Sequence, residues 1–200
     1  MIKKAEEITK PQGKLGILIP GLGAVSTTFI TGVFLVRKGL STPVGSLTQM
    51  GKLRVPRNGD FQQMAIRDYV PLADLNDLVF GGWDIYEDSV YDAVKNAGVI
   101  EKEDYEKVRD ELSAIKPFKA VFDRRFVKNL NGKWVKDAPT LWDKAQLLKE
   151  DILEFKKQNN IDRCVMIWCA STEIFQEAVP GIHDTLANFE KALKENNPAI

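Results

Sequence analysis

Two glycines flanking a leucine, Gly21-Leu22-Gly23, are the residues whose spacing most clearly suggests chemistry. They follow a short apolar run, residues 15–19, within a strand expected over Lys14–Pro20, and precede small residues that open into the apolar stretch 29–36. This order of strand, glycine turn and helix is how α/β proteins bring a pyrophosphate onto the first turn of a helix, where free N–H groups face the anion. The turn therefore indicates a dinucleotide site.

The glycine fingerprint is incomplete in two places. A full fingerprint carries a third small residue three positions after Gly23, and Ser26 stands there instead of glycine. An ordinary Rossmann unit also has an acid about 20 residues past the glycines to hold the ribose hydroxyls, yet residues 41–57 contain none. Arg54 and Arg57 in that interval would suit the extra phosphate of NADP. If a dinucleotide binds, its ribose must be held from elsewhere in the chain.

A second strand signal, at residues 78–80, leads into Gly81-Gly82-Trp83-Asp84-Ile85. Glycines followed by an acid at the carboxyl end of a strand are typical of a ligand-binding edge. Asp84 is therefore our candidate for the missing ribose partner. The alternative is that Asp84 caps the next helix, which we expect over residues 86–96. The sequence leaves both interpretations open.

A third apolar strand, expected over residues 163–169, ends in small residues, Ala170-Ser171-Thr172. The carboxyl ends of parallel strands lie on one edge of a doubly wound sheet. The glycine turn, Asp84 and this third strand end could therefore meet around one dinucleotide.

Five helical patterns separate or follow these strands, at residues 26–38, 86–96, 102–115, 139–158 and 184–196. Residues 60–77 are expected to be loop with a short helix. Such alternation predicts an α/β fold, namely a Rossmann-like three-layer domain with a mainly parallel sheet. Residues 1–200 show no repeat or linker, so we expect one domain.

Composition narrows the function classes. Lys plus Arg equals Asp plus Glu at 28 each, so no overall charge recruits nucleic acid or an anionic membrane. The longest apolar run is too short to span a bilayer, and we expect no secretory segment, because acids follow shortly after the first four residues. Two cysteines suit a reducing compartment, so we expect a cytoplasmic protein.

The remaining reactive side chains predict neither a metal site nor a catalytic pair. His183 is the only histidine, which leaves little material for a triad or a multi-histidine metal site. Cys164 and Cys169 are five apart on a predicted strand and should face opposite sides of the sheet. Asp123, together with Arg124 and Arg125, could approach a ligand, but a surface salt bridge is the commoner fate of such residues.

The three strand ends together resemble one family, myo-inositol-1-phosphate synthase, also called inositol-3-phosphate synthase. Residues 21–28 occupy the place of its glycine-rich NAD loop, and residues 80–85 look like its Gly-Trp-Asp-Ile signature. Residues 165–173 are similar to its strand ending in Ala-Asn/Ser-Thr-Glu, and residues 179–185 to its following Pro-Gly-x-x-Asp-Thr.

The resemblance implies an NAD-dependent isomerase acting on D-glucose 6-phosphate. Oxidation, enolisation, intramolecular aldol cyclisation and reduction would yield 1D-myo-inositol 3-phosphate. It further implies NAD contacts at Gly21, Leu22, Gly23, Ala24, Val25, Ser26, Thr27, Asp84, Ile85, Ala170, Ser171 and Thr172. Residues 24–26 are bulkier than the eukaryotic loop, so that loop departs from the family pattern.

The resemblance also implies that these 200 residues are the N-terminal, NAD-binding portion of a longer enzyme. The catalytic residues are then expected beyond Ile200, and we expect no turnover from this portion alone. Family members are usually homotetramers. The alternatives are an NAD(P)-dependent dehydrogenase of another substrate class, or a non-catalytic nucleotide-binding α/β domain. A dinucleotide titration separates these alternatives.

Overall fold

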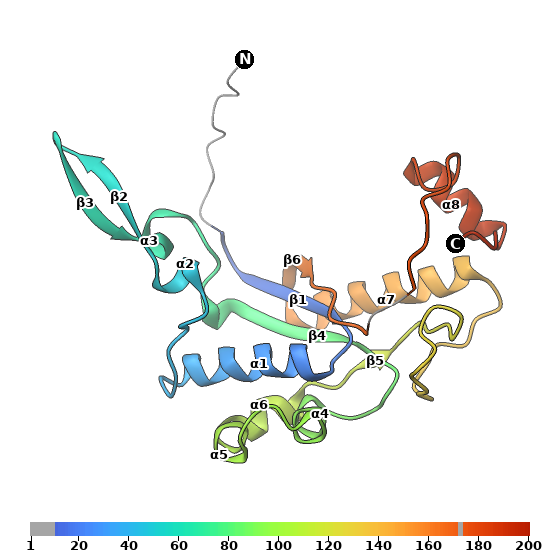
Figure 1. Ribbon diagram of the computed structural model, residues 1–200, viewed down its shortest axis with the longest axis horizontal. Helices are drawn as coiled ribbons and strands as arrows, with labels where there is room; N and C mark the ends of the chain where they lie inside the picture. Colours follow the sequence, from blue (N-terminus) through green and yellow to red (C-terminus); the bar gives the residue numbers. More distant parts are fainter. Residues whose placement is uncertain (1–10, 172–173) are drawn as a thin grey trace.

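A four-stranded parallel sheet forms the centre of the molecule. The computed structural model describes residues 11–171 and 174–200. The strand order is β5-β4-β1-β6, with β1 (Lys14–Pro20) and β4 (Leu78–Asp84) inside and β5 (Phe118–Lys119) and β6 (Ile161–Met166) at the edges. Each neighbouring pair is parallel, so the carboxyl ends share one edge of the sheet (Figure 1). The predicted α/β fold is confirmed.

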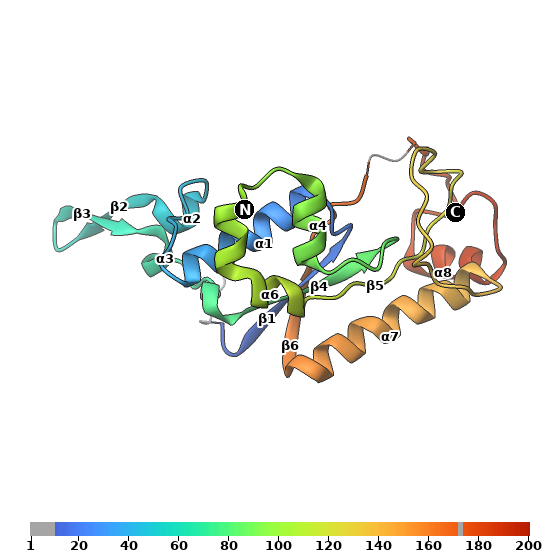
Figure 2. The same ribbon diagram turned by 90° about the horizontal axis from the view of Figure 1, so that it is seen from below.

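Helices cover both faces of this sheet. On one face lie α1 (Ala24–Arg37), α4 (Val90–Ala97) and α6 (Arg109–Ala114), and on the other lies α7 (Leu141–Asn159), as Figure 2 shows. Successive side chains of a strand point to opposite faces, so β1 serves both cores. Ile17 and Ile19 pack on the side of α1, whereas Leu18 packs on the side of α7. These are the three layers that the alternating pattern predicts.

Glycine in the sheet lets α7 lie close to it. The Phe155 ring of α7 is only 5% exposed and packs against the strands with Leu18 and Ile161. A Cβ atom added to Gly81 of β4 would lie 2.6 Å from that ring, and one added to Gly16 of β1 would lie 2.9 Å from it. The hollow that receives Phe155 therefore requires residues without side chains.

The segment after α1 differs from the prediction. Residues 60–77 are expected to be loop with a short helix, but residues 60–65 form strand β3 (Asp60–Ala65). This strand pairs with β2 (Lys52–Arg57) in an antiparallel hairpin. Asn58 and Gly59 connect the strands with φ of 52° and 82°, as an Asn-Gly hairpin turn requires. This dipeptide is the signal that the prediction overlooked. The short helices α2 (Leu47–Met50) and α3 (Ile66–Tyr69) lie at the base of the hairpin, and η1 (Leu75–Asp77) contacts α1.

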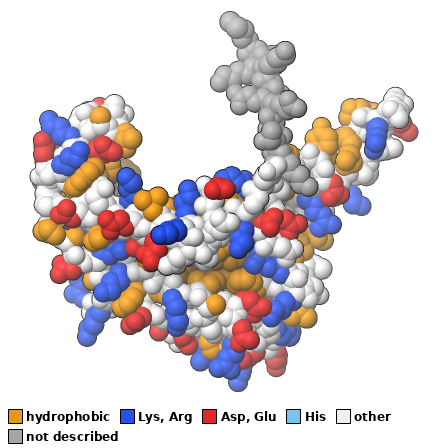
Figure 3. All heavy atoms as spheres, turned by 180° about the vertical axis from the view of Figure 1, so that it is seen from behind, with side chains coloured by type: hydrophobic (Ala, Val, Ile, Leu, Met, Phe, Trp, Pro, Cys, Tyr) orange, Lys and Arg blue, Asp and Glu red, His pale blue; other side chains and the backbone are white. Residues whose placement is uncertain are grey.

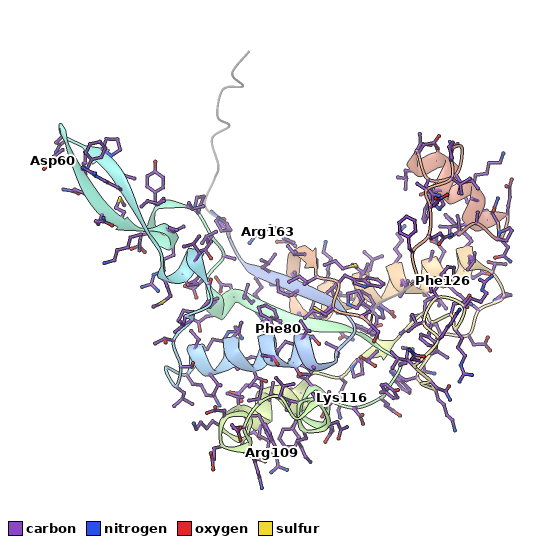
Figure 4. All side chains as sticks on the ribbon, viewed as in Figure 1. Asp60, Phe80, Arg109, Lys116, Phe126 and Arg163 are labelled. Atoms are coloured by element: carbon purple, nitrogen blue, oxygen red, sulfur yellow. The ribbon has the colours of Figure 1, made fainter. Side chains whose placement is uncertain are left out.

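The hairpin projects from the body as an arm, away from the carboxyl edge of the sheet. Asp60 marks its tip in Figure 4, and Phe126 lies at the opposite end of the molecule. Figure 3 shows the arm from behind, with hydrophobic and basic side chains along it. Phe61 is 53% exposed there and lies 4.3 Å from the guanidinium carbon of Arg54.

The other predicted elements form with shifted ends. The helix predicted from residue 86 begins at Val90, because Ser89 caps it by accepting the N–H of Asp92. The helix predicted over 102–115 is divided into α5 (Lys102–Tyr105), η2 (Glu106–Val108) and α6, and α8 (Leu186–Lys194) is shorter than expected. No helix within the described residues is long and apolar enough to cross a membrane.

Candidate nucleotide-binding site

A cleft of about 890 Å³ opens at the carboxyl edge of the sheet. The chain runs from β1 outward to β4 and β5, and then crosses back to β6 on the other side of β1. Such a reversal leaves a crevice outside the strand ends, where open α/β sheets bind ligands. The ends of β1 and β4, the segment after β6 and the loop 120–130 all line the cleft.

The glycine turn joins its two neighbouring strand ends. Gly21 adopts a φ of 87° and donates its N–H to the carbonyl oxygen of Trp83 at 2.8 Å. A Cβ atom at Gly21 would lie 2.5 Å from the Cα of Ala170. On that side, Cys169 donates its N–H to the carbonyl oxygen of Pro20 at 2.9 Å. The three strand ends therefore converge, as the sequence predicts.

The Ser26 side chain holds the glycine turn through hydrogen bonds to its backbone. It is fully buried, and its hydroxyl lies 2.8 Å from the carbonyl oxygen of Gly21 and 3.0 Å from that of Gly23. One O–H is thus shared between two loop carbonyls, in the place of the missing third glycine. Thr27 is equally buried, and its hydroxyl donates to Ala24 at 3.2 Å. These side chains hold the loop in shape, whereas the cleft is lined by the residues before them.

The first turn of α1 suits an anion. No side chain in the described part of the chain caps this helix, and its first turn holds no acid. The N–H groups at such a helix start favour negative charge. A Cβ atom at Gly23 would meet no atom within 4 Å, so the backbone lies open there. These features fit the pyrophosphate of a dinucleotide.

The Asp84 carboxylate joins the glycine turn to the segment that follows β4. One carboxylate oxygen accepts the N–H of Leu22 at 2.7 Å, and the other accepts the N–H of Tyr86 at 3.1 Å. Because Ser89 caps α4, the alternative that Asp84 caps this helix is wrong. A carboxylate has about four acceptor positions, so Asp84 can still bind ribose hydroxyls while it holds the glycine turn.

The loop 120–136 completes the cleft. Trp134 donates its N–H to Ile85 at 2.9 Å, and Ala120 donates to Trp134 at 3.1 Å, which folds the loop back onto the end of β4. Asp123 and Arg125 form the expected salt bridge at 2.6 Å, yet both also line the cleft. The hydrogen bond from Arg125 lowers the pKa of Asp123. No sequence pattern marks this folding back.

The two cysteines lie on opposite sides of the sheet, although Cys169 follows the end of β6 and is not part of the strand. Cys164 packs with the cluster on the α7 side and Cys169 with the cluster on the α1 side. Cys169 also lines the cleft. Burial raises the pKa of both thiols, so both favour the neutral form.

Most of the predicted contact residues share this cleft. Those in its lining are Gly21, Leu22, Gly23, Ala24, Asp84, Ile85, Ala170 and Ser171. Val25, Ser26 and Thr27 lie outside the lining, and Thr172 lies outside the described residues. Among residues 11–171 and 174–200, no group of three His, Cys, Asp or Glu could hold a metal ion.

The basic residues that would favour NADP lie elsewhere. Arg54 and Arg57 belong to the projecting hairpin and do not line the cleft. Arg125 is the single basic residue of the lining as described, and Asp123 already pairs with it. An acid at the end of β4, with no free arginine beside it in the described lining, favours NAD over NADP.

A glycine turn at the switch point of a parallel sheet, with an acid on the neighbouring strand end, defines a Rossmann-like dinucleotide-binding domain. The family model described as myo-inositol-1-phosphate synthase matches residues 15–200, and the chain belongs to this family. The matching model is that of an NAD-binding domain, so NAD is the cofactor.

Individual relatives agree. The chain is 46% identical to inositol-3-phosphate synthase 1 of Bacteroides thetaiotaomicron over 98% of its own length and 45% of the relative's. It is 31% identical to inositol-3-phosphate synthase 1 of Oryza sativa subsp. japonica, over 94% of its own length and 40% of the relative's. A crystal structure of inositol-3-phosphate synthase from Caenorhabditis elegans has the same fold, with a TM-score of 0.84 at 23% identity over 94% of this chain and 40% of that one. The chain thus spans less than half the length of these relatives.

Proposed function

We propose that this chain is the NAD-binding part of an inositol-3-phosphate synthase, which converts D-glucose 6-phosphate to 1D-myo-inositol 3-phosphate. The observation that carries the proposal is the meeting of three strand ends at one cleft, in a chain of this family. The turn from Gly21 and the start of α1 would hold the pyrophosphate, and Asp84 the adenosine ribose. Ala170, Ser171 and Thr172 would line the cofactor from the third strand.

The residues of this chain would bind and orient the cofactor. When bound, NAD supplies hydride acceptance and return, which is the redox part of the isomerisation. Asp84 would act twice, because it accepts the Leu22 N–H and also faces the cleft. The shape of the glycine turn and the position of the ribose would therefore depend on the same carboxylate.

A calorimetric titration with NAD, NADP and ATP tests the binding site. The parent chain should bind NAD more tightly than NADP or ATP. Asp84→Ala should weaken NAD binding by about 10- to 100-fold, because hydrogen bonds to a charged group contribute roughly 1.5–3 kcal/mol. The NAD affinity of Asp84→Asn should lie between those of the parent and Asp84→Ala, since the amide oxygen of asparagine can still accept the Leu22 N–H.

Asp88→Ala is the matched control for this titration. Asp88 lines the same cleft, but its hydrogen bond goes to Asn96 and not to the glycine turn. Its substitution should leave the NAD dissociation constant within about twofold of the parent's. A parent chain without NAD binding, or an Asp84→Ala chain that binds like the parent, would refute the assignment.

The substrate is tested in a longer protein that contains this chain. Because the chain spans less than half of its relatives, we expect the catalytic residues beyond Ile200. The longer protein should form inositol phosphate from glucose 6-phosphate, while the 200-residue chain should form none. A correctly folded longer protein that binds NAD but leaves glucose 6-phosphate unchanged would contradict the substrate assignment.

The proposal extends to assembly and location. We propose a homotetrameric enzyme in the cytoplasm, without nucleic-acid or membrane partners. The equal numbers of acidic and basic residues support the lack of nucleic-acid and membrane partners, because the chain has no net positive charge to attract nucleic acid or an anionic membrane. The homotetramer follows from the family resemblance.

A further inference from the structure

Behind the cleft, a buried carboxylate joins three separate segments of the chain. Asp151 of α7 is 8% exposed and accepts the indole N–H of Trp83 at 2.6 Å. The ammonium of Lys136 lies 2.8 Å from one carboxylate oxygen of Asp151 and 3.0 Å from the other. We call Trp83, Lys136 and Asp151 the buried triad. It joins the end of β4, the end of the loop 120–136 and the middle of α7.

Each segment held by the buried triad reaches the cleft. The carbonyl oxygen of Trp83 accepts the N–H of Gly21, and the residue after it is Asp84. The backbone N–H of Lys136 donates to Ala120 at 2.8 Å, where the cleft-lining loop starts. On α7, the neighbouring residues Leu148 and Ile152 line the cleft, whereas Asp151 does not.

The energetics make this arrangement sensitive to each member. A buried charge without its partner is strongly unfavourable, whereas a buried pair replaced as a whole by uncharged groups often is not. The Asp151 carboxylate has both charge compensation from Lys136 and a neutral donor from Trp83. The geometry fixes the indole, and through it the backbone from which Asp84 reaches Leu22.

We propose that Asp151 is a positioning residue for the dinucleotide site. It sets the place of Asp84 and the glycine turn through Trp83, and that of the loop 120–136 through Lys136. The inference rests on the proposed NAD binding for its functional consequence. Its structural consequence, the order of the Leu22 N–H, is independent of any ligand.

Amide hydrogen exchange and NAD titration of the 200-residue chain test the two consequences separately. In Asp151→Asn the amide oxygen can still accept the Trp83 indole, but the charge that Lys136 needs is lost. We expect the Leu22 amide, measured without NAD, to exchange about tenfold faster, and NAD to bind about tenfold more weakly. The NMR signal of the Trp83 indole N–H should shift as well, because its acceptor changes from a carboxylate to an amide oxygen.

Two further variants separate positioning from general loss of stability. Leu112→Ala removes a fully buried side chain on the α1 face, from the cluster that contains Leu22 but no member of the buried triad. It should lower the melting temperature while leaving Leu22 exchange and NAD affinity within about twofold of the parent's. The double variant Asp151→Asn with Lys136→Met removes both charges and keeps an acceptor for the indole. It should restore Leu22 exchange to within about threefold of the parent's.

The outcomes of the exchange experiment decide the inference in either case. The inference is overturned if the Leu22 amide exchanges at the same rate in Asp151→Asn and in Leu112→Ala. It is also overturned if the Leu22 amide exchanges as fast in the double variant as in Asp151→Asn. If the parent binds no NAD, the proposed function fails, and the exchange rates still decide the role of Asp151. If the parent binds NAD and Asp151→Asn binds equally well, the inference fails while the proposed function stands.

Discussion

A Gly21→Ala chain is expected to bind NAD at least about 100-fold more weakly than the parent. Gly21 has a φ of 87°, and a left-handed conformation costs other residues roughly 1–2 kcal/mol. The new Cβ atom would also lie 2.5 Å from the Cα and 2.6 Å from the N of Ala170, both backbone atoms that cannot rotate away. The turn and the third strand end must therefore separate. Calorimetric titration measures the loss of NAD affinity, and thermal unfolding measures the loss of stability.

Gly23→Ala is the control that distinguishes packing from ligand space. Its Cβ atom meets nothing within 4 Å, so the free energy of unfolding should change by less than about 0.5 kcal/mol. Since this position lines the cleft, the added methyl group should still weaken NAD binding by about tenfold. Gly21→Ala with parental stability and affinity would show that the turn does not depend on its approach to Ala170.

Phe155→Ala should cost about 3–5 kcal/mol of folding free energy, the range found for removing a buried aromatic ring. Phe155 is 5% exposed, and its ring fills the hollow above Gly16 and Gly81. Neither glycine has a side chain that can move into the space left behind. For a chain of this size the melting temperature should fall by roughly 10 °C. Urea and thermal unfolding measure these changes.

Leu153→Ala on the same helix is the matched control for this core substitution. Leu153 is 54% exposed, so removing its side chain should change stability by less than about 0.5 kcal/mol. Equal losses for Leu153→Ala and Phe155→Ala would mean that α7 does not pack on the sheet through Phe155. A loss of folding free energy below about 0.5 kcal/mol for both variants would also mean that Phe155 does not hold α7 on the sheet.

The strand ends were predictable because their signals are local. The changes from apolar residues to Gly21 and to Asp84 mark the ends of β1 and β4, and parallel strands end at a common edge. The third strand, predicted over 163–169, forms as β6 and ends at Met166, four residues before Ala170. The fold class follows from the same alternation. The hairpin was also predictable, since Asn58-Gly59 is a strong turn signal between two runs that pair as strands.

Other parts of the site depend on contacts between distant residues. Asp84 lies 62 positions from Leu22, and Asp151 lies 68 positions from Trp83. Nothing in the neighbouring sequence of either acid distinguishes a partner at that range from a helix cap or a solvated charge. The role of Ser26 likewise needed the loop geometry, because its hydroxyl bonds to carbonyl oxygens only once the turn has formed.

The sequence alone determined that the segments leading to Gly21, Asp84 and Ala170 belong to a parallel α/β sheet, and their motifs resemble those of the inositol-3-phosphate synthase family. Periodicity and turn residues act within a few positions, so they can be read without the fold. The tertiary structure alone decided which carboxylate holds the glycine turn, which loop closes the cleft and which buried acid stands behind it. Those choices depend on packing between distant segments, and only the folded chain brings their donors and acceptors within hydrogen-bonding distance.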